Sequence, residues 1–222
     1  EAPLVATPNF LAIGLNYAAH VVESGMEKPK MPVVFNKQVT CVTGPFDPVD
    51  VPTVAPTLVD YEGELGVVIG TACRGVSVED AHKYIAGYLV VNDVSVRDWQ
   101  TASPTMTMGK SWDTHGPIGP WLVTADEVAD PMNLDLITRV NGEVRQSSNT
   151  ANMIWPIPKL IAYVSQMTLE AGDIILTGTP SGVAMGHKGG DWFLKAGDVL
   201  ESELAGIGTM RNRIIDAPDA PT

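Results

Sequence analysis

The sequence has little cysteine, few basic residues and no long apolar run, and each shortage argues against a class of protein. Among its 222 residues are two cysteines, Cys41 and Cys73, too few for a disulfide framework, and we expect a reduced, cytoplasmic protein. Lysine and arginine total 14 against 26 acidic residues, a formal charge of −12 that repels nucleic acid and anionic membranes. No apolar segment approaches the roughly 20 residues of a membrane span. The opening residues lack the basic and apolar parts of a signal peptide.

The rest of the composition is that of an ordinary globular protein. Hydrophobic residues make up 45% and charged residues 18%, which argues against disorder. No linker or low-complexity stretch divides residues 1–222, so we expect a single domain. With 21 glycines and 17 prolines between short β-rich runs, the sequence predicts an α+β fold that is mainly β.

The local patterns predict more strands than helices. The predicted strands are residues 10–15, 33–36, 58–70, 87–93, 173–177 and 199–204, together with a hairpin over Leu134–Arg145 that turns at Asn141-Gly142. The predicted helices are residues 16–23 capped by Asn16, residues 77–86 capped by Ser77, and residues 156–167. Two similar turns, Glu170–Asp173 and Lys195–Asp198, each precede a predicted strand.

The segment Leu58–Gly70 places three acidic residues on one face of its predicted strand. Side chains alternate along a strand, so Asp60, Glu62 and Glu64 lie opposite the apolar residues. Glu62 and Glu64 would then lie about 6 to 7 Å apart, and they repel unless a cation or a proton neutralises them. The alternative is the wet face of a half-exposed strand. The residues alone leave these two interpretations evenly balanced, since strands disfavour acidic clusters.

Asp93 is a further acidic candidate because it ends the apolar run that begins at Gly87. An aspartate at such a position is commonly a turn residue, and that alternative stays open. Ligation by oxygen alone suits hard cations, so a metal here is expected to be Mg²⁺, with Mn²⁺ or Ca²⁺ as alternatives. No cluster of histidine or cysteine favours zinc.

Several segments, taken in order, resemble the fumarylacetoacetate hydrolase family. They extend from about residue 10 to residue 213 and comprise Gly14–Glu23, Pro32–Lys37, Tyr61–Gly66, Asn92–Gln100, Gly109–Thr114, Asn141–Glu143 with Asn149–Thr150, and Leu176–Val183. The resemblance is to the catalytic domain of the family, without the extra N-terminal domain of many members. It implies a mixed β-sandwich roll that is usually a homodimer.

Carried over residue by residue, the resemblance also implies a site. The implied ligands of Mg²⁺ or Mn²⁺ are Glu62, Glu64 and Asp93. The implied water-activating pair is His20 and Glu23, the catalytic lysine is Lys110, and plausible substrate contacts are Arg97, Gln100 and Thr179. His20 and Glu23 are three residues apart and share a helical face, although such a pair in isolation is more often a surface pair. Lys110 in isolation would more often be a surface lysine.

The resemblance implies a 2-keto acid as substrate. We expect hydrolysis of a C–C bond in an acylpyruvate-like or other 2,4-diketo acid, by way of a pyruvate enolate that Mg²⁺ stabilises. The alternatives within the family are decarboxylation of oxaloacetate and isomerisation of diacids of the 2-hydroxyhepta-2,4-diene-1,7-dioate type, as in aromatic catabolism. An alternative of another class is a non-catalytic, metal-binding oligomeric β-domain, which would not need His20 or Lys110. The loop Ser24–Pro32 is predicted to close over the substrate as a lid.

Overall fold

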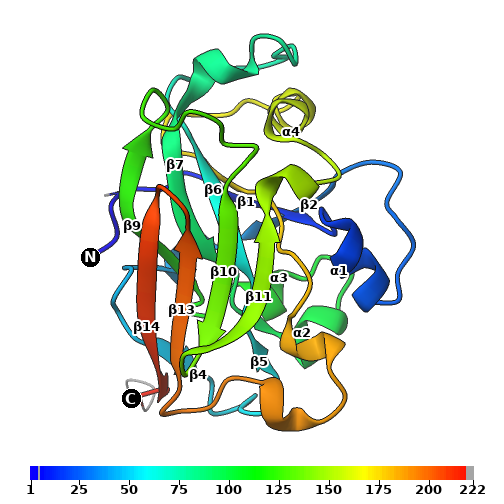
Figure 1. Ribbon diagram of the computed structural model, residues 1–222, viewed down its shortest axis with the longest axis vertical. Coiled ribbons are helices and arrows are strands. Elements are labelled where there is room, and N and C mark those ends of the chain that lie inside the picture. Colours follow the sequence, from blue (N-terminus) through cyan, green and yellow to red (C-terminus); the bar gives the residue numbers. More distant parts are fainter. Residues whose placement is uncertain (5, 219–222) are drawn as a thin grey trace.

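The computed structural model describes residues 1–4 and 6–218 and consists mainly of two β-sheets (Figure 1). The larger sheet has seven strands in the spatial order β2 (Val33–Lys37), β1 (Phe10–Gly14), β12 (Ile174–Leu176), β6 (Gly63–Ile69), β7 (Ile85–Asn92), β9 (Gly116–Thr124) and β3 (Val42–Thr43). The smaller has five in the order β11 (Glu143–Asn149), β10 (Asp135–Val140), β13 (Val199–Leu204), β14 (Gly208–Asp216) and β4 (Val49–Val51). A separate pair joins β5 (Val59–Asp60) and β8 (Ser95–Val96).

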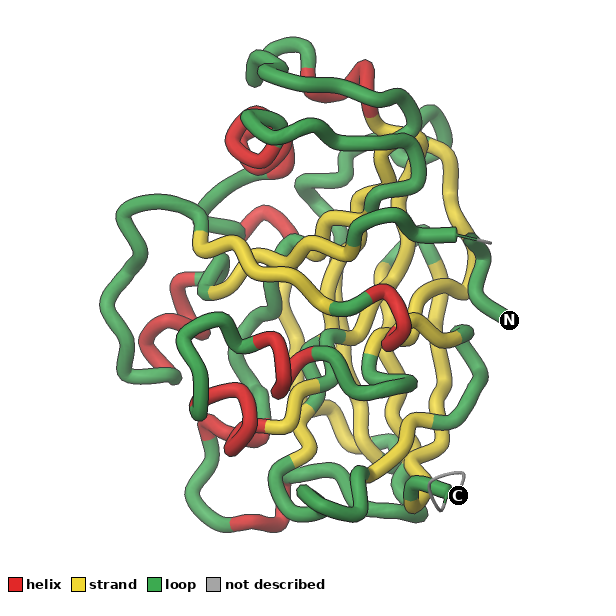
Figure 2. The backbone as a smooth tube through the Cα atoms, turned by 180° about the vertical axis from the view of Figure 1, so that it is seen from behind, coloured by secondary structure: helices red, strands yellow, loops and turns green. Residues whose placement is uncertain are grey.

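The helices are short, and three of them lie on one side of the sheets. These are α1 (Ala18–Glu23) and α2 (Arg97–Thr101), to the right in Figure 1 and to the left in the reverse view of Figure 2, and α3 (Thr107–Lys110), which Figure 1 draws behind β10 and β11. The fourth, α4 (Ile157–Val164), lies at the top in Figure 1. Among the described residues, no helix is both long and apolar enough to span a membrane.

An apolar core fills the space between the two sheets and extends beneath α4. Every second residue of β6 contributes to it, namely Leu65, Val67 and Ile69, with Leu136 of β10 and Leu204 of β13 from the facing sheet. The apolar residues of α4 recur at helical spacing and are all buried: Ile157, Leu160, Ile161 and Val164. The helical pattern between residues 156 and 167 is therefore confirmed, and burial of this stripe stabilises the short helix.

The turns that the sequence predicts are also confirmed. Strands β10 and β11 pair as a hairpin whose two turn residues, Asn141 and Gly142, have φ angles of 53° and 80°. Such left-handed angles suit the twist of a two-residue hairpin. In the two similar turns, the backbone N–H of the first residue donates to the aspartate three positions along, at 2.8 Å for Glu170 and 2.9 Å for Lys195.

Two predicted helices are wrong in detail. Asn16 does not cap α1; instead its amide group donates to the carbonyl oxygens of Trp155 and Thr177 at 3.1 and 2.7 Å, which ties distant loops to the start of the helix. Residues 77–86 contain only a 3₁₀ turn, Ala81–Tyr84. The helix cannot continue to residue 86 because strand β7 begins at Ile85.

The predicted strand over residues 58–70 is interrupted at Tyr61 and Glu62, between β5 and β6. The Glu62 N–H donates to the side-chain oxygen of Asn92 at 3.0 Å, and the Gly63 N–H donates to that of Gln146 at 2.9 Å. Side-chain acceptors thus replace sheet partners at the break. The alternative of a solvent-exposed acidic face is wrong, because Asp60, Glu62 and Glu64 are only 0, 5 and 2% exposed.

Candidate active site

Three buried carboxylates meet at the end of β6. Glu62 directly precedes this strand, Glu64 lies within it, and Asp93 follows the antiparallel neighbour β7. One carboxylate oxygen from each residue lies within 4.8 Å of the other two. The pairing of Gly63 with Asn92 brings the start of one strand beside the end of the other, which explains this convergence. The three predicted ligands are therefore brought together, and we call this group the carboxylate centre.

The carboxylate centre suits a hard divalent cation. It offers oxygen atoms alone, the donor set that Mg²⁺, Mn²⁺ and Ca²⁺ prefer. Burial, followed by the charges of Asp93 and Glu62, raises the pKa of Glu64 well above its usual range. Burial and the two neighbouring carboxylates thus both disfavour the ionised form of Glu64. A divalent cation held by Glu62, Glu64 and Asp93 would favour the ionised form.

Lys110, the last residue of α3, contacts two of these carboxylates. Its Nζ donates to Glu62 Oε2 and to Asp93 Oδ2 at 2.8 Å each. Burial acts to lower the pKa of Lys110, but Asp93 and Glu62 outweigh it and raise the pKa, so the group is charged. A Cβ on the preceding Gly109 would lie 2.1 Å from the backbone nitrogen of Gln100. Glycine at this position thus allows α3 to approach α2 and bring Lys110 to the centre.

Lys37, at the end of β2, is a second buried lysine in contact with Asp93. Its Nζ donates to Asp93 Oδ1 at 2.6 Å and to the carbonyl oxygen of Val94 at 3.3 Å. Since Lys110 takes the other oxygen of Asp93, the two lysines together fix the orientation of this carboxylate. No role for Lys37 follows from the sequence. The only available signal is its position at the end of an apolar strand, within a segment that resembles the family.

Arg97 supports the centre from α2. Its Nη1 donates to Glu62 Oε1 at 2.5 Å and its Nε to Asp60 Oδ2 at 2.8 Å. Asp60 also accepts the backbone N–H groups of residues 184 and 185 at 2.7 and 2.9 Å. Burial acts to raise the pKa of Glu62, but Lys110 and Arg97 outweigh it and lower that pKa to about 2. Glu62 is therefore held ionised at neutral pH.

His20 and Glu23 form the predicted pair on α1. His20 Nδ1 lies 3.1 Å from Glu23 Oε2, and His20 is 6% exposed. The other oxygen of Glu23 accepts the backbone N–H of Gly182 at 2.8 Å, which fixes the carboxylate. A carboxylate that orients an imidazole is the arrangement that general base catalysis requires.

The predicted substrate contacts are engaged with other protein groups. Arg97 Nη1 donates to Gln100 Oε1 at 2.8 Å. The Thr179 hydroxyl donates to the carbonyl oxygen of Gly63 at 3.0 Å and accepts from Gln146 Nε2 at 2.7 Å. These bonds order the walls of the site. A substrate contact by Arg97, Gln100 or Thr179 stays a prediction.

One loop, residues 178–185, holds three of the carboxylates through its backbone. The N–H of Gly178 donates to Glu64 Oε2 at 2.6 Å, and its φ of 99° belongs to the region that favours glycine. The same loop supplies the N–H groups already described for Glu23 and Asp60. Backbone donors leave no side-chain pattern, so this contribution could not be found from residue types.

The fumarylacetoacetate hydrolase C-terminal family model matches residues 9–215. The chain belongs to the fumarylacetoacetate hydrolase family. A protein of Burkholderia cenocepacia, named provisionally as a hydrolase, is 49% identical over 210 residues, which cover 94% of this chain and 74% of that protein. The resemblance of the sequence segments to this family is thus confirmed.

Solved structures of family members agree. The 5-carboxymethyl-2-hydroxymuconate delta-isomerase of Mycobacterium smegmatis is 39% identical with a TM-score of 0.86, over 98% of this chain and 82% of that one. The maleylpyruvate hydrolase of Sphingobium sp. SYK-6, solved with manganese(II) and pyruvate, is 34% identical with a TM-score of 0.83, over 98% and 74%. The mainly β fumarylacetoacetate hydrolase fold is confirmed, and family members like this chain include both a hydrolase and an isomerase.

Proposed function

We propose that the protein is a divalent-metal-dependent hydrolase that cleaves a C–C bond in an acylpyruvate-like or other 2,4-diketo acid. The observation that carries this proposal is the His20–Glu23 pair, which is anchored on Gly182 in the same loop whose Gly178 N–H binds Glu64 of the carboxylate centre. A metal site alone would serve many reactions of keto acids. Activation of water requires a general base as well, and an oriented histidine is such a base.

The charge of the site favours an anionic substrate once a divalent cation is bound. Four carboxylates (Asp60, Glu62, Glu64 and Asp93) face three side-chain cations (Lys37, Arg97 and Lys110), a formal charge of −1. A divalent cation changes this charge to +1, which suits the carboxylate of a 2-keto acid. We propose Mg²⁺ or Mn²⁺ as this cation, because both favour oxygen donors.

The residues divide the chemistry between them. A divalent cation at the centre would supply Lewis-acid polarisation of the keto acid. His20, oriented by Glu23, takes a proton from water, and the resulting hydroxide attacks the distal carbonyl carbon. The C–C bond then breaks: the acyl part leaves as a carboxylic acid, and the bonding electrons pass to the pyruvate part, which takes up a proton.

Lys110 adds positive charge at the keto end of such a substrate, because it contacts Glu62 and Asp93. The resemblance implies a different place for this charge, on the oxyanion at the distal carbonyl. That role would require the ammonium to leave one of its carboxylate partners, and it stays a prediction. Charge at the keto end alone stabilises an enolate in hydrolysis, decarboxylation and isomerisation alike.

The second candidate is therefore an isomerase or decarboxylase of the same family, and the likeness to an isomerase favours it. The non-catalytic β-domain is less favoured because it gives no account of the His20–Glu23 pair. A test is to incubate the protein with Mn²⁺ or Mg²⁺ and acetylpyruvate, oxaloacetate or 2-hydroxyhepta-2,4-diene-1,7-dioate. We expect pyruvate and acetate from acetylpyruvate. Release of CO₂ from oxaloacetate without any acylpyruvate cleavage would reject hydrolysis.

A further inference from the structure

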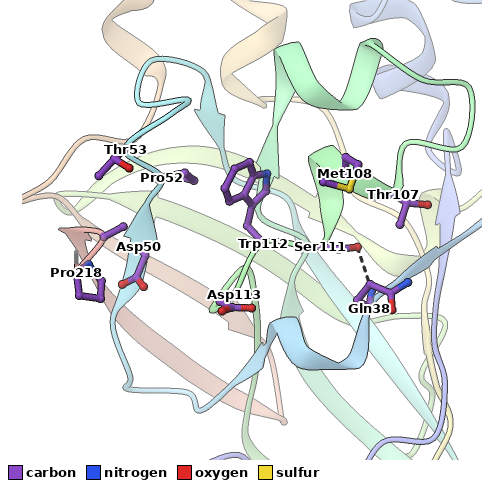
Figure 3. Close-up of a pocket in the computed structure, with 11 residues that line it drawn as sticks. Gln38, Asp50, Pro52, Thr53, Thr107, Met108, Ser111, Trp112, Asp113 and Pro218 are labelled. Carbon is purple, nitrogen blue, oxygen red and sulfur yellow. Dashed lines mark hydrogen bonds between the residues drawn. The ribbon is translucent and has the colours of Figure 1, made fainter. Parts of the chain in front are cut away.

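A cleft of about 490 Å³ lies beside α3, outside the carboxylate centre (Figure 3). Thr107 and Met108 of α3 line it, whereas Lys110 at the end of the same helix contacts Glu62 and Asp93. None of the residues that line the cleft belongs to the proposed catalytic or metal-binding set. The cleft is therefore a separate cavity.

The cleft shares a wall with the carboxylate centre. Gln38 and Ser111 line the cleft, and each directly follows one of the two buried lysines, Lys37 and Lys110. The backbone N–H of Gln38 donates to the hydroxyl of Ser111 at 3.0 Å, drawn as a dashed line in Figure 3. In each of the dipeptides Lys37-Gln38 and Lys110-Ser111, the lysine therefore contacts Asp93 and the next residue lines the cleft.

The lining combines an aromatic ring with negative charge. Figure 3 shows the indole ring of Trp112 between Pro52 and Met108, with the carboxylates of Asp50 and Asp113 below it. No lysine, arginine or histidine is among the described residues that line the cleft. An indole face and a carboxylate both attract a cation, while the apolar surface attracts a hydrocarbon body.

The recognising groups are held in place before any ligand arrives. Trp112 packs edge to face against Trp99 of α2, with ring centroids 5.1 Å apart at an angle of 79°. The Asp50 N–H donates to Thr114 Oγ1 at 2.9 Å, so the backbone beneath this carboxylate is fixed. Asp50 and Asp113 both line the cleft, and burial, followed by the charge of Asp113, raises the pKa of Asp50 (Figure 3).

We propose that this cleft is a second ligand site, which takes a small organic ammonium ion with an apolar body. The ammonium group lies between Asp50 and Asp113, and the apolar body packs on Trp112 and Met108. A neutral molecule of the same shape would leave the repulsion between the two carboxylates in place, and an anion would increase it. Charge complementarity therefore selects the cation.

Occupation of the cleft is transmitted to the carboxylate centre through the shared wall. A ligand that orders Gln38 and Ser111 restrains the backbone of Lys37 and Lys110, and hence the two cations that orient Asp93. Coupling of this kind is reciprocal: a metal that changes the affinity of the ammonium ion has its own affinity changed by the same factor.

Three compounds of one shape and different charge test the site. Isothermal titration calorimetry is carried out with benzylammonium, benzyl alcohol and benzoate, at pH 7 and without metal. We expect saturable binding of benzylammonium about tenfold tighter than benzyl alcohol, and no binding of benzoate. Asp113→Asn should weaken benzylammonium about tenfold, and Asp126→Asn, a change at an exposed acid outside the cleft, should leave it unchanged.

The site would be overturned by equal binding of the cation and the alcohol, by binding that is unaffected by Asp113→Asn, or by an equal loss with Asp126→Asn. It would also be overturned if benzylammonium binds only at protein concentrations where sedimentation shows monomers. The cleft would then be part of an interface between two copies of the chain. Because no metal is present, failure here is distinct from failure of the proposed hydrolase.

The coupling is tested by titrating Mn²⁺ with and without saturating benzylammonium, following Mn²⁺ by electron paramagnetic resonance. This step depends on the proposed metal site. We expect at least a twofold change in the Mn²⁺ dissociation constant, mirrored by the same factor in the benzylammonium constant. An unchanged Mn²⁺ constant at full occupancy would reject the coupling.

Discussion

The apolar core between the sheets and the carboxylate centre are both buried, yet different forces hold them. The core consists of residues at regular spacing on a few elements, such as Leu65 and Leu160, and each contacts many equivalent neighbours. The centre is formed by single charged residues from separate elements, and each has one or two specific partners. A lost methyl group in the core leaves a cavity that can partly relax. A lost charge in the centre leaves its partner buried and unpaired. Substitutions in the two regions should therefore be separable by experiment.

The largest effect is expected from Asp93→Asn. This change removes a predicted metal ligand and leaves Lys37 facing a neutral group. We expect Mn²⁺ affinity to fall about a thousandfold, beyond the roughly 10- to 100-fold loss typical of residues that only support ligands. Calorimetric titration with Mn²⁺ measures this, with Asp126→Asn as a control. Retention of Mn²⁺ affinity in the variant would remove Asp93 from the metal site.

Leu160→Ala tests the other side of the comparison. Leu160 is 1% exposed in the apolar core, and its truncation should lower the free energy of unfolding by about 2 to 5 kcal/mol. Mn²⁺ affinity should not change. Urea denaturation gives the first quantity, and Met167→Ala, at a position 57% exposed, serves as the control. A parallel loss of Mn²⁺ affinity would show that the two regions are not independent.

His115, which does not belong to the carboxylate centre, should make the free energy of unfolding depend on pH. Burial lowers the pKa of His115 to about 4 from the 6.5 of a free histidine. As pH falls below 6.5 the unfolded chain takes up a proton while the folded protein does not. The free energy of unfolding should therefore fall between pH 6.5 and 4, by up to about 3 kcal/mol. Denaturation at pH 7 and pH 4.5 should show a smaller difference for His115→Gln than for the natural protein. Equal differences would contradict this account.

The smallest effect is expected from His20→Gln, which keeps the volume and polarity of the side chain but removes the base. Hydrolysis of acetylpyruvate should fall about a hundredfold, the scale of general base catalysis. Mn²⁺ affinity should stay the same, because His20 contacts Glu23 and does not belong to the carboxylate centre. Pyruvate release measures the rate. Undiminished hydrolysis in this variant would exclude His20 as the base.

The sequence predicts the regular parts of the fold well and the irregular parts poorly. Helix α4 and the hairpin at Asn141-Gly142 follow from local periodicity and turn chemistry, and both are found. Strand β9 was not predicted because Pro117 and Pro120 lie within it and resemble turn residues. Strand β14 was also missed, although Met210, Asn212 and Ile214 alternate as buried residues, because a buried asparagine breaks the apolar pattern.

The candidate site shows the same division. Glu62 and Glu64 are two residues apart, so spacing alone suggested that they act together. The contacts of Lys37 could not be found in this way, because its partner Asp93 lies 56 residues along the chain and only the sheet brings the two together. The break in the strand before Gly63 depends on the side chains of Asn92 and Gln146. No local sequence pattern predicts it, because these residues lie 30 and 83 positions away from the N–H groups that they accept.

The loop that holds the carboxylates has a consequence for the order in which the protein is made. Gly178 lies 114 residues after Glu64, and the N–H that binds Glu23 lies 159 residues after it. Chains emerge from the ribosome with the N-terminal part first, so the acidic groups appear long before their backbone donors. Until residue 185 has emerged, Glu64, Glu23 and Asp60 lack the backbone donors that bind them in the folded protein. The carboxylate centre can therefore be completed only after residues 178–185 have been made, well after the strand that carries Glu64.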